Sequence, residues 1–126
     1  INFRPTIIPN TITYATVMDA HARQGNTEGA NKVFKMMKDD YKSGNKKAKP
    51  NVQAYSILID AWAKSENSDG PAEVESILEE INQACVSGEL DEGPNKVTYA
   101  AMITCLENFQ EYKERVLELR GIMSKM

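Results

Sequence analysis

The sequence contains little of the chemistry on which most catalytic and metal sites depend. Among its 126 residues there are two cysteines and one histidine. Cys85 and Cys105 are too few for a disulfide framework and stand in no C-x-x-C or Cys/His spacing, which indicates reduced structural residues. His21 has no second histidine as a partner, and neither a Gly-rich phosphate loop nor a nucleophile elbow is present. We therefore expect no enzyme: no catalytic residues, no metal site and no cofactor.

Long apolar runs and targeting patterns are absent as well. No apolar stretch approaches the roughly 18 to 20 residues that a membrane span needs, so we expect no membrane among the partners. The N-terminal residues have neither a secretory nor an organellar leader pattern. Because the first residue is Ile rather than Met, we expect the native protein to extend further in this direction. The length and the hydrophobic content of 41% suit one compact domain.

Excess positive charge is also missing. The net charge is −3, and it is spread unevenly along the chain. Residues 1–63 carry 9 Lys/Arg against 5 Asp/Glu, a balance of +4, whereas residues 64–126 carry 6 against 13, a balance of −7. A uniformly basic surface for phosphate binding is therefore not predicted.

The sequence does contain a repeated motif, marked by three tyrosines at intervals of 41 and 44 residues. A Pro-Asn pair stands four to five residues before each tyrosine. The three copies are Pro9-Asn10 before Tyr14, Pro50-Asn51 before Tyr55, and Pro94-Asn95 before Tyr99. Similarity at a period of this length is typical of a solenoid, in which each unit buries its apolar face against its neighbours.

Each unit is predicted to be a hairpin of two helices. Apolar residues recur at steps of three and four, which indicates helices rather than strands. Gly25-Asn26 interrupts this pattern in the first unit, and Pro50 precedes the second. The expected helices are 11–24, 27–42, 52–64, 71–86, 96–107 and 110–125. We assign 11–51, 52–95 and 96–126 to three repeats of one array, and 1–10 to the end of a preceding repeat.

The residue pattern of the motif resembles that of the pentatricopeptide repeat family. Pro-Asn, a tyrosine, apolar positions and Asp are followed by a basic residue, Gly and a second helix of the type Ala…Val-Phe…Met-Lys. The matching residues of the first unit are Pro9, Asn10, Thr13, Tyr14, Asp19, Arg23, Gly25, Ala30, Phe34, Met37 and Lys38. In the first helix of the second unit, the matching residues are Pro50, Asn51, Tyr55, Leu58, Ile59, Asp60, Ala63 and Lys64. In the third unit they are Pro94, Asn95, Val97, Thr98, Tyr99 and Ile103. The resemblance implies an all-α fold, a right-handed α-solenoid of stacked helix-turn-helix repeats.

The repeats are longer than the family's common form. Thirteen positions separate Met37 from Pro50, and thirteen also separate Ile81 from Pro94, which is six more than usual in both units. The same extension in both units predicts a duplicated variant with lengthened second helices or loops. Because insertions in a solenoid go to one edge, the stacking of the first helices is expected to survive.

The resemblance implies binding of single-stranded RNA, about one nucleotide per repeat, along the concave face of the first helices. The positions that the family uses for reading bases are Ala15 with Asn51, Ser56 with Asn95, Ala100 as the first member of a third pair, and Asn10 as the remnant of an earlier repeat. Ser56 with Asn95 is expected to prefer adenine, since a hydroxyl and an amide together satisfy its edge. The two alanines offer no hydrogen-bonding group, so discrimination there should be weak.

Other positions of the family's binding face carry over in part. Ile12 and Val97 match the branched apolar residue that sandwiches a base, and Gln53 departs from it. Arg23 and Lys64 match a phosphate-contacting cation, where the third unit has an asparagine. The family also implies a role in RNA processing, stability or translation in a mitochondrion or chloroplast.

Simpler explanations stay open for the same residues. Asn before a helix is a common N-cap, and cations near a helix C terminus are favoured by the dipole. The alternative function is a protein-interaction scaffold, such as an accessory subunit of a ribosome or another large complex. A positive groove along the first helices would favour RNA, and an acidic or apolar one would favour a protein partner.

Overall fold

The computed structural model describes residues 8–126, and within them the chain is helical with no strand. The elements are α1 (Thr11–Ala22), α2 (Thr27–Lys42), the 3-10 turn η1 (Lys46–Ala48), α3 (Val52–Ser65), α4 (Gly70–Ser87), α5 (Lys96–Leu106), the 3-10 turn η2 (Gln110–Tyr112) and α6 (Lys113–Ser124). The predicted all-α fold of helix hairpins is confirmed. The repeat boundaries stay a prediction, and most of the proposed preceding repeat, residues 1–7, lies outside the described part.

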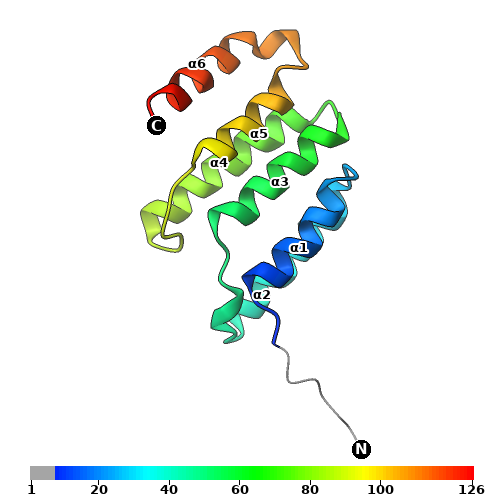
Figure 1. Cartoon of the computed structure of the whole chain (residues 1–126), viewed down its shortest axis with the longest axis vertical. Helices are drawn as coiled ribbons and strands as arrows, with labels where there is room; N and C mark the ends of the chain where they lie inside the picture. Colours follow the sequence, from blue (N-terminus) through cyan, green and yellow to red (C-terminus); the bar gives the residue numbers. More distant parts are fainter. Residues whose placement is uncertain (1–7) are drawn as a thin grey trace, which may run out of the picture.

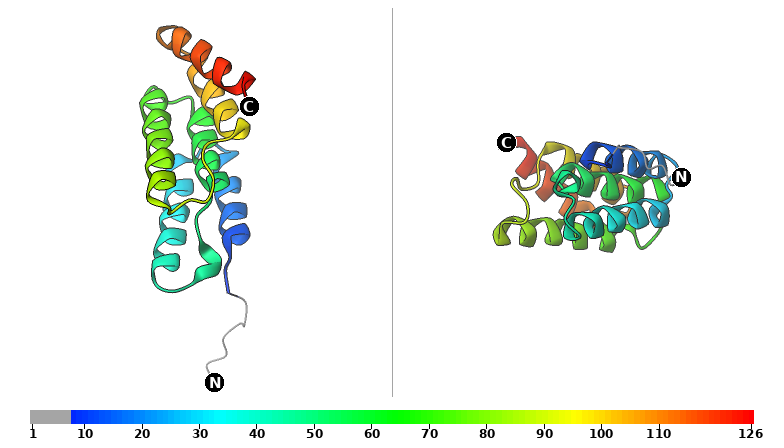
Figure 2. Two further views of the ribbon diagram at one scale, coloured as in Figure 1. Left: turned by 90° about the vertical axis from the view of Figure 1, so that its left-hand side faces the viewer. Right: turned by 90° about the horizontal axis from the view of Figure 1, so that it is seen from below.

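The hairpins stack so that α1, α3 and α5 lie side by side, with α2 and α4 behind them (Figure 1; Figure 2). α3 packs against α1 and α5, and also against α2 and α4, while α6 packs on α5. The core fills the space between these two layers. Its fully buried side chains include Met18, Met37, Ile59, Ile81, Met102, Leu106 and Leu119. Both cysteines are free thiols, and burial raises the pKa of Cys105 to about 11.

Asparagine begins all three first helices through the same local interaction. The side-chain Oδ1 of the cap accepts a hydrogen bond from the backbone N–H three residues later: Thr13 to Asn10 at 2.8 Å, Ala54 to Asn51 at 3.0 Å, and Thr98 to Asn95 at 3.0 Å. The cap satisfies an N–H that has no acceptor within the helix. As a result, Tyr14, Tyr55 and Tyr99 each stand at the fourth residue of their helix.

Two predicted helix boundaries differ from the structure by more than one residue. α1 ends at Ala22 because Gly25, with φ of 68°, reverses the chain, and the N–H of Asn26 then donates to the carbonyl of His21 at 3.0 Å. The last helix does not begin at Gln110. There the chain first forms η2, in which the N–H of Tyr112 donates to the carbonyl of Phe109 at 3.1 Å, and α6 starts at Lys113.

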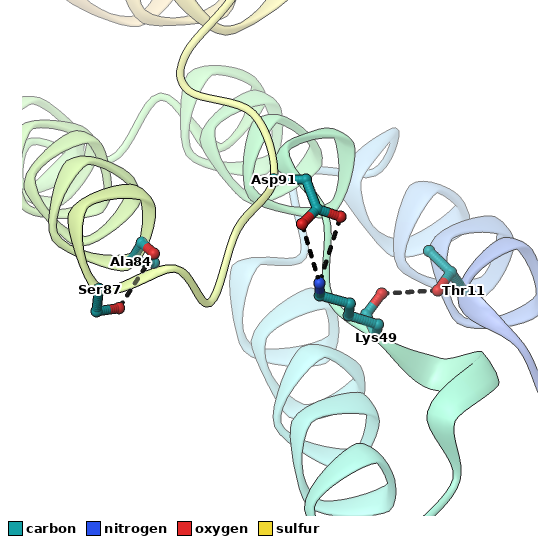
Figure 3. A network of polar contacts seen from close by, with 5 residues as sticks. All are labelled: Thr11, Lys49, Ala84, Ser87 and Asp91. Atoms are coloured by element: carbon teal, nitrogen blue, oxygen red, sulfur yellow. Dashed lines mark hydrogen bonds and ion pairs between the residues drawn. The ribbon is translucent and has the colours of Figure 1, made fainter.

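In the structure, the repeat extension forms additional helical residues in the second helices and an ordered loop. α2 and α4 have 16 and 18 residues. The loop after α2 folds back on α1: Asn45 donates to the carbonyl of Pro9 at 2.8 Å, and the Thr11 hydroxyl donates to the carbonyl of Lys49 at 2.7 Å. The ammonium group of the same lysine pairs with Asp91 at 3.2 Å, in the loop after α4 (Figure 3). The extension thus links neighbouring repeats at one edge of the stack.

Candidate nucleic-acid interface

One stripe of each first helix faces away from the second helices and forms a candidate binding surface. Residues at i, i+4, i+7 and i+11 share one side of a helix. The stripe consists of Ile12, Thr16 and Asp19 on α1 with Arg23 at its C-cap, of Gln53, Ile57, Asp60 and Lys64 on α3, and of Val97, Ala101 and Thr104 on α5 with Asn108 just beyond its end. None of these side chains is fully buried. We call this surface the first-helix face.

The predicted base-sandwiching positions lie open at one end of the first-helix face. Ile12 and Val97 are 74% and 65% exposed, although both are large apolar residues. Gln53 occupies the same position of α3 and is exposed as well. Each of the three follows a capping asparagine by two residues. The structure therefore repeats one arrangement, an accessible side chain beside an asparagine amide, on three neighbouring helices.

The capping asparagines keep one polar group for other partners. Because Oδ1 accepts from a backbone N–H, the amide orientation is determined and Nδ2 is left for other partners. The Nδ2 groups of Asn51 and Asn95 have no hydrogen-bond partner within residues 8–126. Asn51 is half-buried, and Asn95 is exposed. Structural capping and an exposed donor are thus combined in the same residues.

Ser56 lies inside the protein rather than on the first-helix face. It is 4% exposed, its Oγ donates to the carbonyl of Val52 at 3.0 Å, and it lies 2.8 Å from the Oγ1 of Thr98. Thr98 in turn lies 3.1 Å from the Oδ1 of Asn95. The predicted pair Ser56 and Asn95 is therefore joined only through Thr98, which the sequence analysis did not assign to the site.

The alanine positions behave differently in the two repeats. Ala15 is buried in α1, with 8% exposure, whereas Ala100 is exposed on α5. Neither offers a hydrogen-bonding group, as the sequence required. The remaining reading position, Asn10, caps α1 and also receives the hydroxyl of Thr13 at 3.0 Å.

The predicted phosphate-contacting cations each have an acidic partner one turn earlier. Arg23 pairs with Asp19 at 2.9 Å, and Lys64 pairs with Asp60 at 2.6 Å. These pairs were not predicted, although their i,i+4 spacing is visible in the sequence. In the third repeat Asn108 donates to the Thr104 carbonyl at 3.4 Å instead. The charges of the first-helix face therefore largely cancel, and the face is neither strongly basic nor strongly acidic.

A cleft lies between the C-terminal parts of α2 and α4. It has a volume of about 450 Å³. The lining includes Lys38, Tyr41, Lys42, Lys49 and Leu90, together with Tyr55 at its base. Most of its lining belongs to the two repeat extensions. Lys38 and Lys49 are already paired with Glu80 and Asp91, whereas Lys42 and Glu89 of the lining have no ion pair within residues 8–126.

Stacked helix hairpins with equivalent residues on neighbouring first helices define a helical-repeat protein. The model of the PPR repeat family matches residues 9–64, which extend from the start of α1 almost to the end of α3. This match supports a pentatricopeptide repeat protein, and proteins of this family typically bind RNA. No curated protein matches the chain. None of the helices described here is long and apolar enough to cross a membrane.

Proposed function

We propose that the chain binds single-stranded RNA along the first-helix face, with about one nucleotide at each junction between repeats. A base would stack on the exposed side chain at the second position of a first helix. The neighbouring asparagine would then donate from Nδ2 to the edge of that base. Two complete junctions are available, α1 with α3 and α3 with α5.

The observation that carries this proposal is the exposure of Ile12 and Val97 at equivalent positions. A single exposed apolar residue needs no explanation, but two at the same place in the repeat do. Flat apolar contacts suit unstacked bases, whose faces gain from stacking whatever their identity. The capping asparagines beside them supply the polar group that such a site needs for orientation.

The ion pairs on the first-helix face determine how strongly the RNA backbone is held. Phosphates must compete with Asp19 for Arg23 and with Asp60 for Lys64. We therefore expect moderate affinity and a shallow salt dependence, corresponding to about two phosphate contacts. Replacing Arg23 and Lys64 by Ala should weaken binding and flatten the salt dependence further. Replacing Asp19 and Asp60 by Asn should strengthen binding.

Fluorescence anisotropy with a labelled single-stranded RNA, titrated at several salt concentrations, tests the proposal. Val97→Ala should lower the affinity by about threefold or more, since base–side-chain stacking contributes about 1 kcal/mol or more. Val86→Ala is the matched control, because Val86 is 89% exposed on α4 and not on the first-helix face. Equal effects of the two variants, or an unchanged salt slope in the Arg23/Lys64 variant, would refute binding at this face.

The alternative function is a protein-interaction scaffold, such as an accessory subunit of a ribosome or another large complex. The observation that favours it is the pairing of both cations on the first-helix face. If the chain is a scaffold, Val97→Ala should not change the anisotropy titrations with RNA.

A role in RNA processing, stability or translation in a mitochondrion or chloroplast belongs to the proposal as well. Imaging of a tagged full-length protein tests the location.

A further inference from the structure

The cleft between the C-terminal parts of α2 and α4 is built by the two repeat extensions. Its lining lies within residues 38–49 and 82–93, except for Pro50 and Tyr55. These two segments separate the last core positions of each second helix from the next Pro-Asn pair, and both are lengthened alike. No residue of the lining belongs to the first-helix face. Binding at that face therefore does not account for the cleft.

The cleft combines buried apolar residues with an exposed aromatic side chain. Tyr55, Ala84 and Leu90 of the lining are buried and belong to the hydrophobic core. Tyr41, near the end of α2, is exposed, and its hydroxyl has no hydrogen bond among residues 8–126. The volume of about 450 Å³ is in the range of sites that enclose a ligand rather than a single water molecule. An apolar side chain of a ligand can therefore be buried here.

The charged residues of the cleft leave one cation and one anion without a partner. Lys38 and Lys49 each pair with a carboxylate, at 3.6 and 3.2 Å. Figure 3 shows the second pair, which links the segment before α3 to the loop after α4. Lys42, the last residue of α2, and Glu89, just beyond α4, are exposed and have no ion pair within residues 8–126. A ligand that carries both signs of charge would match them.

This balance of charge favours a protein over a nucleic acid. The three lysines of the lining are matched by Glu89 and by the two carboxylates paired with Lys38 and Lys49. A phosphate backbone is held by an excess of cations, which the cleft does not have. A protein segment can instead supply an apolar side chain for the buried surface, a carboxylate for Lys42 and a cation for Glu89.

We propose that the cleft binds a short segment of another protein, in which an apolar or aromatic residue stands between an acidic and a basic residue. The apolar side chain lies on Tyr55 and Leu90, beside the ring of Tyr41. The acidic residue pairs with Lys42, and the basic residue pairs with Glu89. Because the cleft and the first-helix face share no residue, this binding is independent of the proposed RNA binding, and the chain can hold both partners at once.

Selection from a random hexapeptide library displayed on phage, with the wild-type chain as bait, is the first test. The enriched peptides should share an apolar or aromatic residue flanked by one acidic and one basic residue. Anisotropy with a labelled synthetic copy of the most enriched peptide then measures affinity. Tyr41→Ala should lower it about fivefold or more, because an aromatic anchor of the site is lost. Met36→Ala is the matched control, since Met36 is exposed on α2 outside the lining.

Reversal of one charge tests the orientation of the segment. Lys42→Glu should lower the affinity about fivefold, because an ion pair is replaced by repulsion. A second peptide, with Lys in place of its acidic residue, should restore binding to this variant and bind the wild-type chain weakly. Lys32→Glu is the control, since Lys32 is an exposed residue of α2 outside the lining. Circular dichroism of each variant verifies that the helices are retained.

Several results would overturn the inference. These are no enrichment of any peptide, equal effects of Tyr41→Ala and Met36→Ala, and no recovery of Lys42→Glu with the second peptide. Displacement of the labelled peptide by oligoadenylate would also overturn it, since the cleft would then be a nucleic-acid site.

Discussion

Among the three repeated tyrosines, Tyr14 has a short hydrogen bond to a carboxylate of its own hairpin. Its hydroxyl donates to Asp40 at 2.7 Å, and Asp40 also accepts from Asn45 at 2.8 Å. Tyr55 instead packs its ring edge-on against Phe34, with centroids 4.8 Å apart. Burial and the bond to Asp40 raise the pKa of Tyr14 to about 12, and the same bond lowers the pKa of Asp40. The first repeat is thus fastened by a polar contact between α1 and the end of α2.

Tyr14→Phe should make stability less sensitive to alkaline pH. The folded chain keeps the Tyr14 proton up to a pKa of about 12, whereas the unfolded chain releases it near 10. The contribution of this group is therefore complete below pH 10 and is lost between 10 and 12. Urea unfolding at increasing pH should show the wild-type advantage shrinking over that interval. Tyr41→Phe is the control, since Tyr41 is 37% exposed and its hydroxyl has no bond among residues 8–126.

At the scale of elements, α6 is held less firmly than the other helices. Among its residues only Val116 and Leu119 are buried. A two-point ion pair adds to this small apolar contact: Arg115 donates from Nε and Nη2 to the carboxylate of Glu75 on α4, at 2.7 and 2.9 Å. Both side chains are 31% exposed, which makes the pair stronger than a fully exposed one.

Arg115→Lys should therefore loosen α6 without unfolding the rest of the array. Lysine cannot reproduce the planar two-point contact, so we expect a loss of about 1 kcal/mol in the local opening free energy. Hydrogen exchange of the α6 amides should accelerate about fivefold, with α3 unchanged. Arg120→Lys is the matched control, because the Arg120–Glu107 pair is 57% and 47% exposed. Acceleration spread over all helices would contradict this prediction.

At the scale of the whole molecule, α3 is the element on which the stack depends. It packs against α1, α2, α4 and α5, whereas α1 and α6 each lie at one end of the array. In a solenoid, stability is the sum of repeat terms and of the interfaces between neighbours. A defect in α3 therefore weakens two interfaces at once, and a defect at an end weakens one.

Ile59→Ala should destabilise the folded chain by about 2 to 4 kcal/mol. Ile59 is 0% exposed in α3, and its truncation leaves a cavity that its neighbours fill only in part. Urea unfolding followed by circular dichroism should show a lower midpoint for the entire helical signal. Leu117→Ala, on the outer side of α6 and 61% exposed, should change the midpoint little. A loss confined to a fraction of the signal would show that the repeats unfold independently.

The sequence alone determined the hairpins and the starts of the three first helices, because both depend on interactions within a few residues. Asn10, Asn51 and Asn95 cap helices through bonds that span three positions, and apolar spacing marks the buried side of each helix. The predicted helix 27–42 agrees with α2 at both ends. The i,i+4 acid partners of Arg23 and Lys64 were equally local, and sequence reasoning should have included them.

Only the tertiary structure decided which polar groups face the solvent and which face a neighbouring repeat. Ser56 and Thr98 meet 42 positions apart in the chain, and Tyr14 meets Asp40 across a hairpin. No pattern along the sequence specifies such contacts, since they depend on how far one helix is rotated against the next. Helical periodicity assigns a residue to a face, but the packing of α3 against α5 decides whether that face is covered.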